Sequence, residues 1–337
     1  MTRVMTRAIT WRPRALAASL VLLVASPALA QRSAPAGRVV SDTFWSPIMT
    51  VRKVARVYLP PSYAEGGKRY PVVYYLHGAS GSENDWVAQG HIDATMDSLV
   101  RAGMPELIVV MPDGDDGWWT TWNALNAPGC ARDTARREQA ATYCVPWPKY
   151  DDYVARDLVA HVDSSYRTIA DRGHRGIAGL SMGGYGAVTL ALGYPDVFSA
   201  AASHSGVLAP LLGIPHDGLP APSGEPADVY ELHARWPAWL WPSLRLAFGQ
   251  HDMFGWYARD PARMLARTER AGRAVPPLFV DVGAGDPFLE ENRAFVEQAR
   301  ALGARVEYQE WPGTHDWRYW RAHSPQSLVW LAAHVAR

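Results

Sequence analysis

Short apolar runs alternate with segments of helical spacing along most of this chain, and this alternation limits the fold more than any other feature. Some runs are nearly continuous, as in YPVVYYLHG at 70–78 and ELIVVMPDG at 106–114, which is typical of strands buried on both faces of a sheet. Further runs lie at 53–60, 176–181, 198–206, 276–286 and 305–313, and helical patterns lie at 85–103, 153–166, 287–303 and 327–337. This order predicts an α/β fold with a mostly parallel central sheet and helices on both faces.

Residues 208–256 interrupt the alternation. The segment is rich in Pro and Trp and shows no clear hydrophobic period. Loops of this length inside a domain are usually functional or disordered, but large aromatic side chains are uncommon in disordered segments. Two interpretations stay open: an insertion over the sheet on the side of the functional site, or an irregular connection.

The first thirty residues differ from the rest of the chain. They carry four arginines before an apolar run from Ala15 to Ser26, and small residues end at Ala30. The pattern predicts a cleaved secretory signal over 1–30, because its apolar core is shorter than the roughly 20 residues of a membrane span. An uncleaved anchor is the alternative. We therefore expect an exported protein, periplasmic or extracellular, in which residues 31–337 form a single domain.

Export changes how the two cysteines are interpreted. Cys130 and Cys144 lie 14 positions apart in a polar stretch, and an oxidising compartment would allow them to pair. Closing a loop of this size contributes about 3 kcal/mol in the chain-entropy model. We predict a disulfide, with two free thiols or a metal pair lacking other ligands as alternatives.

The charge balance excludes some partners. The chain has 33 Lys and Arg residues against 33 Asp and Glu residues, so it carries no net charge at pH 7. A nucleic-acid partner is not expected, because such proteins concentrate positive charge. His, Asp and Glu residues do not gather at the spacing of metal ligands, so no metal and no other cofactor is predicted. No membrane span is expected after residue 30, and the oligomeric state is left open.

Ser181 is the first candidate functional residue. Residues 179–183 read Gly-Leu-Ser-Met-Gly, a G-x-S-x-G sequence between a predicted strand and a predicted helix. In that context the motif forms a sharp turn that exposes the serine, and larger side chains at the two glycines would collide with neighbouring backbone. The context therefore favours a nucleophile at Ser181 over an ordinary glycine-rich turn.

A serine hydroxyl needs a base and an acid that orients the base. When a G-x-S-x-G serine is the nucleophile, the acid and the histidine follow it in that order along the chain. Asp286 and His315 each lie just beyond a late predicted strand, with one helix between them. They are the predicted acid and base. A helix cap is the alternative role for Asp286.

Four residues compete for these two roles. For the base, His204 is the main rival, whereas His77 precedes Gly78 and better suits a loop that supports an oxyanion site. For the acid, Asp281 lies inside a predicted strand and Glu290 one helical turn too late.

An oxyanion site would complete the arrangement. One donor in this type of site is the backbone N–H after the nucleophile, here Met182, and the second comes from the loop after an early strand. The sequence YYLHGASG at 74–81 supplies that loop, and Ala79 is the candidate. A plain glycine-rich turn is the alternative.

With these residues in place, the chain resembles the esterase D-like branch of the α/β-hydrolases. This branch includes feruloyl and acetyl-xylan esterases, S-formylglutathione hydrolases and antigen 85 acyltransferases. The resemblance covers about residues 50–335 and is carried by VYLPPSY, YPVVYYLHG, VVMPDG, GLSMGGYGA, DPFLEENRAF and WPGTHDW. It implies an α/β-hydrolase fold and ester chemistry at the positions of Ser181, Asp286 and His315. The sequence SHSG at 203–206 departs from the small residues that relatives often have there.

The resemblance leaves three functions open, because one fold hosts several activities. The first is a secreted serine esterase acting on short acyl or aryl esters, such as feruloyl or acetyl esters, of a carbohydrate or a small molecule. The second is an acyltransferase that uses the same three residues. The third is a binding protein without catalysis. The candidate substrate contacts are five tryptophans, for which core packing is the alternative: Trp118, Trp119, Trp122, Trp236 and Trp241.

Overall fold

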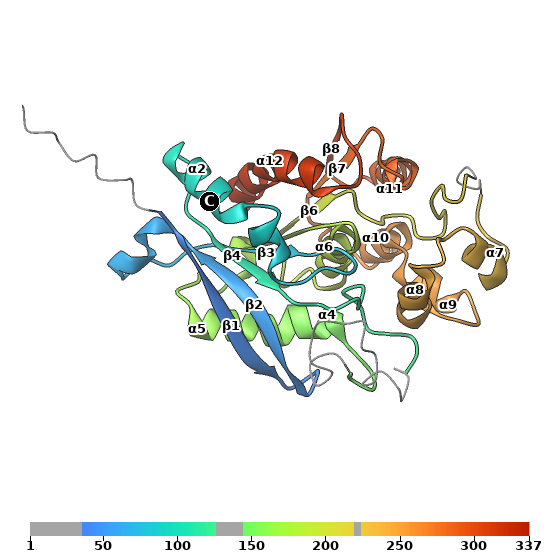
Figure 1. The fold of residues 1–337 in the computed structure, drawn as a ribbon, viewed down its shortest axis with the longest axis horizontal. Helices are drawn as coiled ribbons and strands as arrows, with labels where there is room; N and C mark the ends of the chain where they lie inside the picture. Colours follow the sequence, from blue (N-terminus) through green and yellow to red (C-terminus); the bar gives the residue numbers. More distant parts are fainter. Residues whose placement is uncertain (1–35, 126–143, 219–223, 337) are drawn as a thin grey trace, which may run out of the picture. The chain divides into compact units, whose positions relative to one another are not determined.

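The computed structural model describes residues 36–125, 144–218 and 224–336, and Pro35–Arg337 form one compact unit. A sheet of eight strands runs through this unit in the order β1-β2-β4-β3-β5-β6-β7-β8 (Figure 1). The strands are β1 Arg38–Ser46, β2 Val51–Leu59, β3 Val72–Leu76, β4 Ile108–Pro112, β5 Arg175–Leu180, β6 Ala200–His204, β7 Leu278–Gly283 and β8 Val306–Trp311.

The strands divide into two groups by direction. β1 pairs with β2, and β2 with β4, in antiparallel register, whereas the neighbours from β4 through β3 to β8 are parallel. The carboxyl ends of the parallel strands therefore meet at one edge of the sheet. Ligand sites of open α/β sheets form at that edge.

Burial on both faces explains the continuous apolar sequence of the central strands. In β3, Val72, Tyr74 and Leu76 enter one core cluster, while Val73 and Tyr75 enter the other. Successive side chains of a strand point to opposite faces, so both faces of this strand need apolar residues. Helices cover both faces, as the sequence predicts, and the α/β-hydrolase fold is confirmed.

One face carries α2 (Ile92–Arg101) and α12 (Trp317–Val335), which contact each other. The other face carries α6 (Met182–Gly193), α10 (Pro261–Arg270) and α11 (Leu289–Ala301). The other helices before β6 are α1 Asp85–Ala88, α4 Tyr150–Asp152, the π-helical turn Tyr153–Leu158, α5 Val159–Ser165 and the short 3₁₀ turns Pro61–Glu65 and Arg172–His174. Among the described residues, no helix is long and apolar enough to span a membrane.

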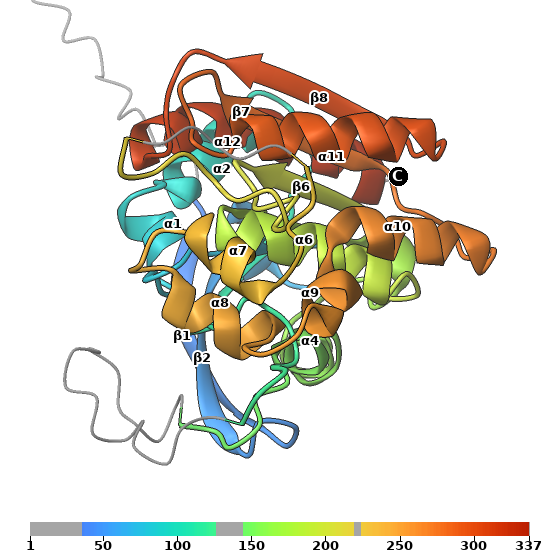
Figure 2. The same cartoon turned by 90° about the vertical axis from the view of Figure 1, so that its right-hand side faces the viewer.

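The aromatic segment after β6 folds into short helices. It contains α7 (Val229–Ala234), α8 (Trp241–Phe248) and α9 (Phe254–Arg259), which lie together at one end of the sheet in Figures 1 and 2. Asp228 begins α7 by accepting hydrogen bonds from the backbone N–H groups of Tyr230 and Glu231, as a capping carboxylate does. Of the two interpretations of this segment, the folded insertion therefore agrees with the structure over its described residues.

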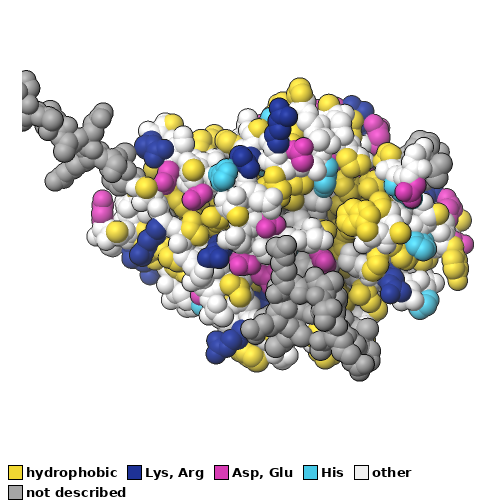
Figure 3. Space-filling view, in the orientation of Figure 1, with side chains coloured by type: hydrophobic (Ala, Val, Ile, Leu, Met, Phe, Trp, Pro, Cys, Tyr) yellow, Lys and Arg dark blue, Asp and Glu magenta, His cyan; other side chains and the backbone are white. Residues whose placement is uncertain are grey.

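Several large apolar side chains of the insertion face solvent. Tyr230, Trp239 and Phe254 are 86%, 69% and 77% exposed. Figure 3 shows hydrophobic side chains gathered between the positions that α11 and α8 have in Figure 1, with acidic and histidine side chains among them toward α7.

Two predictions fall wholly or partly outside the described residues. The signal sequence at 1–30 lies entirely outside them. Of the predicted disulfide, Cys130 lies outside and Cys144 inside. Both stay predictions.

Candidate active site

Ser181 occupies a strained turn between β5 and α6. Its φ is 53° and its ψ is −118°, a combination that residues with a side chain rarely adopt. The flanking glycines are required by contact. A Cβ at Gly179 would lie 2.4 Å from the backbone of Gly183, and one at Gly183 would lie 2.4 Å from the carbonyl oxygen of Leu76. The steric reason predicted for the two glycines is confirmed.

Ser181, His315 and Asp286 form a hydrogen-bonded chain. His315 Nε2 lies 3.0 Å from Ser181 Oγ, and His315 Nδ1 lies 3.0 and 3.1 Å from the two carboxylate oxygens of Asp286. A carboxylate accepts hydrogen bonds, so Nδ1–H donates to Asp286 and Nε2 is left to accept the serine proton. The side chain of Asp286 is fully buried and that of His315 is 23% exposed. The arrangement can remove a proton from the serine hydroxyl.

The loops that carry Asp286 and His315 are bonded to each other. They follow the parallel pair β7 and β8, in which Gly283 is opposite Trp311. The N–H of Ala284 donates to the carbonyl of Trp311, and the N–H of Gly285 donates to the carbonyl of Gly313, both at 2.8 Å. Asp286 Oδ1 also accepts from the N–H of Phe288 at 2.9 Å, so this carboxylate stabilises the turn before α11 and contacts His315 as well.

The loop after β3 runs against Ser181. A Cβ built on Gly78 would lie 2.7 Å from the side chain of Leu180 and 3.4 Å from Cβ of Ser181, so the backbone that leads to Ala79 is adjacent to the serine. Met182 is the first residue of α6, and the N–H groups of a first helical turn have no partner within the helix. The two predicted oxyanion donors, Ala79 and Met182, therefore lie on segments that both border Ser181.

His77 braces the loop that contains Ala79. Its Nε2 accepts a hydrogen bond from the N–H of Gly114 at 3.0 Å, which leaves Nδ1 to donate to the carbonyl of Gly78 at 2.8 Å. Trp119 Nε1–H donates to the carbonyl of His77 at 3.3 Å. His77 therefore supports the loop that carries Ala79, and both of its ring nitrogens bond to backbone groups.

A buried ion cluster lies behind His77, and the sequence interpretation missed it. Lys53 Nζ contacts Asp113 at 2.5 Å and Asp115 at 2.7 Å, and the lysine side chain is fully buried. Burial disfavours all three charges. The two carboxylates nevertheless raise the pKa of Lys53. At Asp113 burial is opposed by the charge of Lys53, by His77 and by the hydrogen bonds from Lys53 and the Asp115 backbone, which together lower the pKa of this carboxyl. Burial dominates at Asp115 and raises its pKa. The cluster joins β2 to the loop that holds Trp119.

Aromatic rings surround His315. The ring of Phe288 lies 4.8 Å from that of His315, and the ring of Trp320 lies 4.9 Å from it, edge to face. Trp317 packs against Trp320 at 5.4 Å and is partly exposed. None of the three was singled out from the sequence. The sequence feature that could have identified them is their position shortly after Asp286 and His315.

The candidate substrate tryptophans are mostly core residues. Trp118, Trp119, Trp122 and Trp236 are at most 5% exposed, and each indole N–H bonds within the protein, to Ser243, His77, Gly117 and Pro210 respectively. This burial agrees with the packing alternative and leaves these four rings almost no surface for a substrate. Trp241 alone of the five is half-buried, and it stacks on His233 and Trp256.

No group of three or more His, Cys, Asp or Glu residues within the described ranges could hold a metal ion. The site joins a hydroxyl, an imidazole and a carboxylate in one hydrogen-bonded chain. The chemistry available to it is proton transfer and attack by an activated hydroxyl.

The sheet, the turn at Ser181 and the two late loops define the class of protein, an α/β-hydrolase. The model of the Esterase family, described as "Putative esterase", matches residues 46–331, and the chain belongs to this family.

Known proteins show the same likeness. An endo-1,4-beta-xylanase/feruloyl esterase of Xylanibacter ruminicola is 30% identical over 167 residues, which are 48% of this chain and 20% of that protein. An acetyl esterase of Caldicellulosiruptor saccharolyticus is 22% identical over 263 residues, 77% of this chain and 82% of that protein. The solved structure of a ferulic acid esterase is similar with a TM-score of 0.65 and 26% identity, covering 88% of this chain and 98% of that chain. The chain thus spans about a fifth of the length of the first of these relatives.

Proposed function

We propose that the protein hydrolyses carboxylic esters through a covalent acyl-enzyme on Ser181. His315 Nε2 takes the proton from Ser181 Oγ as the oxygen attacks the ester carbonyl, and the protonated imidazole then gives this proton to the leaving alcohol. Water then gives a proton to His315 as its oxygen attacks the acyl carbonyl. The bond from this carbon to Ser181 Oγ breaks, His315 returns the proton to the serine, and the acid is released. The observation that carries the proposal is the hydrogen-bonded chain from Ser181 through His315 to Asp286.

Two further roles complete the proposed mechanism. Asp286 holds the imidazole with Nδ1 protonated and stabilises the positive charge that forms on it. The backbone N–H groups of Met182 and Ala79 stabilise the oxyanion of the tetrahedral intermediate. Neighbouring backbone packs closely around this turn, and donors that are fixed in place stabilise a developing charge most strongly.

For the substrate, we propose a short acyl or aryl ester, feruloyl or acetyl, carried by a carbohydrate or a small molecule. The names of the relatives, a feruloyl esterase and an acetyl esterase, support this class. Trp317, which is partly exposed and packs on Trp320 next to His315, offers an apolar wall to a flat acyl group. Aromatic rings prefer offset or edge contacts with such a wall.

Hydrolysis of an ester panel tests the proposal. Acetyl, butyryl and octanoyl p-nitrophenyl esters and methyl ferulate are supplied to the protein from Gln31 onward, with Ser181→Ala and His315→Ala as controls. We expect turnover of the short or aromatic esters and a loss of about 10³-fold or more in each variant. A loss below about tenfold would remove that residue from the mechanism. Faster transfer to an added alcohol than to water would favour an acyltransferase.

We also propose that the protein is exported, with cleavage after Ala30 and a disulfide between Cys130 and Cys144. The basic start and apolar run of residues 1–30 support export, and an oxidising compartment supports pairing. N-terminal sequencing of the protein recovered outside the cytoplasm and thiol titration under denaturing conditions test the two statements. An N-terminus at Met1 would contradict cleavage, and two titratable thiols would contradict the disulfide.

A further inference from the structure

A cavity lies on the outer side of α6, away from the hydrogen-bonded Ser181, His315 and Asp286. Its volume is about 460 Å³, within the range of small-molecule sites. It lies between α4, α6, α9 and the start of α10, and Ser181, Asp286 and His315 do not line it. Along α6, the lining residue nearest to Ser181 is Tyr185, four residues beyond it, and the lining continues to Gly193 at the other end of the helix. The cavity is therefore separate from the site where the acyl-enzyme would form.

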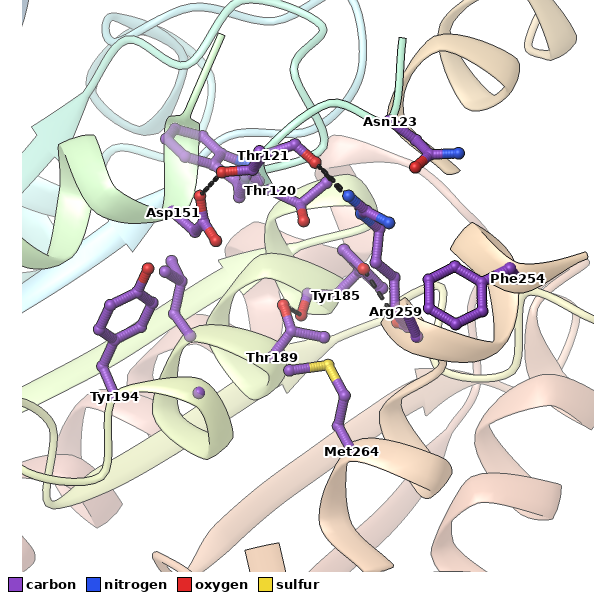
Figure 4. Close-up of a pocket in the computed structure, with 14 residues that line it drawn as sticks. Thr120, Thr121, Asn123, Asp151, Tyr185, Thr189, Tyr194, Phe254, Arg259 and Met264 are labelled. Atoms are coloured by element: carbon purple, nitrogen blue, oxygen red, sulfur yellow. Dashed lines mark hydrogen bonds between the residues drawn. The ribbon is translucent and has the colours of Figure 1, made fainter. Parts of the chain in front are cut away.

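Two opposite charges face this cavity from different sides. Figure 4 shows Asp151 and Arg259 on opposite sides of it, with Thr120 and Thr189 between them. Both charged groups bond to Thr121. Nε and Nη2 of Arg259 donate to the carbonyl of Thr121 at 3.1 and 2.7 Å, and the hydroxyl of Thr121 donates to Asp151 Oδ1 at 2.6 Å. The described residues contain no ion pair between Asp151 and Arg259. Each group is held in place by bonds to other residues and lines the cavity.

The polar groups retain unused bonding capacity. A guanidinium has five N–H donors, and the bonds of Arg259 to Thr121 and Gly255 use three of them. A carboxylate has about four acceptor positions, and Thr121 uses one at Asp151. The hydroxyl of Thr189 donates to the carbonyl of Tyr185 at 3.0 Å, which leaves its lone pairs free to accept. Donors and acceptors therefore both face the cavity, already oriented by bonds within the protein.

The remaining wall is apolar. Leu190, Met264 and Phe254 line the cavity, and Phe254 is 77% exposed, so its ring is accessible at the rim. A simple anion does not fit, because Asp151 would repel it. A simple cation does not fit either, because Arg259 is present. A neutral ligand with several hydroxyl groups and one apolar face matches both the mixed donors and acceptors and the apolar wall.

We propose that this cavity binds the ring of a neutral sugar, at a site distinct from the esterase site. The hydroxyl groups of the sugar bond to Asp151, Arg259 and Thr189, and its C–H face packs on Phe254. The residues that line the cavity are the basis for proposing the site. The choice of pentoses as the first probes rests on the proposed function.

Binding is measured with the Ser181→Ala protein, so that no ester chemistry interferes. D-xylose, L-arabinose, D-glucose and xylobiose are titrated and followed by calorimetry and ligand-observed NMR, with L-leucine as a zwitterionic probe. We expect saturable binding of at least one sugar in the millimolar range. We expect Asp151→Asn and Thr189→Val each to weaken it by about tenfold, because the first replaces a charged acceptor oxygen with an amide NH₂ and the second removes a hydroxyl. Asp217→Asn, a carboxylate that is 86% exposed and outside the cavity, should leave it unchanged.

Three outcomes would overturn the proposal: no saturable binding of any sugar, sugar binding that neither cavity variant weakens, and binding of leucine in preference to the sugars. Circular dichroism shows whether the variants are folded. Ester hydrolysis is a second check, measured on Asp151→Asn and Thr189→Val proteins that keep Ser181. Ester hydrolysis by the wild type is measured separately. The sugar site and the proposed esterase mechanism can therefore fail independently of each other.

Discussion

Nδ1 of His204 lies 2.6 Å from Oδ2 of Asp281 in the core, where both side chains are fully buried. The two residues are opposite each other on the neighbouring strands β6 and β7. His204 Nε2 is 2.8 Å from the hydroxyl of Ser327, and the hydroxyl of Tyr319 donates to the other oxygen of Asp281 at 2.9 Å. The two rivals of His315 and Asp286 thus pair with each other, and they link α12 to the sheet.

Removing the hydroxyl of Tyr319 tests this link. Tyr319→Phe leaves one oxygen of the buried Asp281 without its donor, so we expect a loss of about 1–3 kcal/mol in the free energy of unfolding. Urea denaturation measures it. Tyr308→Phe is the matched control, because the Tyr308 hydroxyl bonds to an exposed carboxylate, Glu310, and should change stability by less than about 0.5 kcal/mol. Equal effects of the two variants would contradict the role of the buried bond.

Lys53→Met tests the buried ion cluster. The substitution leaves Asp113 and Asp115 buried without their cation, and we expect a loss of about 3–5 kcal/mol in stability. Lys68→Met removes an ion pair whose lysine side chain is 55% exposed, and it should cost less than about 1 kcal/mol. Chemical denaturation at neutral pH compares the two. A loss at Lys53 as small as that at Lys68 would show that the buried charges are solvated or neutral.

Asp260 should make stability depend on pH. Burial raises the pKa of this carboxyl to about 6, although the N–H of Arg263 opposes the shift. Between pH of about 4 and 6 the unfolded chain loses a proton that the folded protein keeps, so stability falls as the pH rises through this window. Asp260→Asn cannot ionise and keeps an acceptor for Arg263. We expect the variant to be about 2–3 kcal/mol more stable than the wild type at pH 8, with the difference vanishing below pH of about 4. Urea denaturation of the wild type and the variant at pH 8 and at pH of about 4 measures this difference in stability. The same difference at both pH values would contradict a raised pKa of Asp260.

Two glycines of α6 should respond oppositely to alanine. A Cβ at Gly183 would lie 2.4 Å from the carbonyl of Leu76, whereas one at Gly193 would have Met264 Cε, at 3.8 Å, as its nearest atom. We expect Gly183→Ala to destabilise the fold and abolish hydrolysis. Gly193→Ala should be neutral or stabilising by up to about 1 kcal/mol, because alanine is the better helix former. Thermal unfolding and ester turnover measure both. An active, stable Gly183→Ala protein would show that the turn tolerates larger residues.

The parts of the structure that follow from local pattern were predictable. The strands from β2 to β8 were predicted from apolar or alternating runs, β8 (VEYQEW) being the least apolar. The G-x-S-x-G turn has a steric rule that identifies Ser181. Edge strand β1 was missed, because much of it is exposed and its polar residues interrupt the apolar pattern. α12 begins at Trp317 and contains Pro325, whereas the sequence predicted a helix only after that proline, since proline usually breaks helices.

The ion cluster and the roles of the tryptophans depend on tertiary contacts. Lys53 sits among apolar residues of β2, where a lysine normally points to solvent, and only the fold brings Asp113 and Asp115 to it. An indole suits a core and a binding cleft equally well, so composition cannot assign a tryptophan to either. The structure favours core packing for Trp118, Trp119, Trp122 and Trp236, because each indole N–H bonds to another residue of the protein.

The backbone of Ser181 has a consequence for engineering. A side-chain-bearing residue held at a φ of 53° and a ψ of −118° stores about 1–3 kcal/mol of strain, which glycine would not suffer. A laboratory selection for thermal stability alone would therefore enrich glycine at this position and yield a more stable but inactive protein. Directed evolution of this scaffold needs activity and stability scored in the same round.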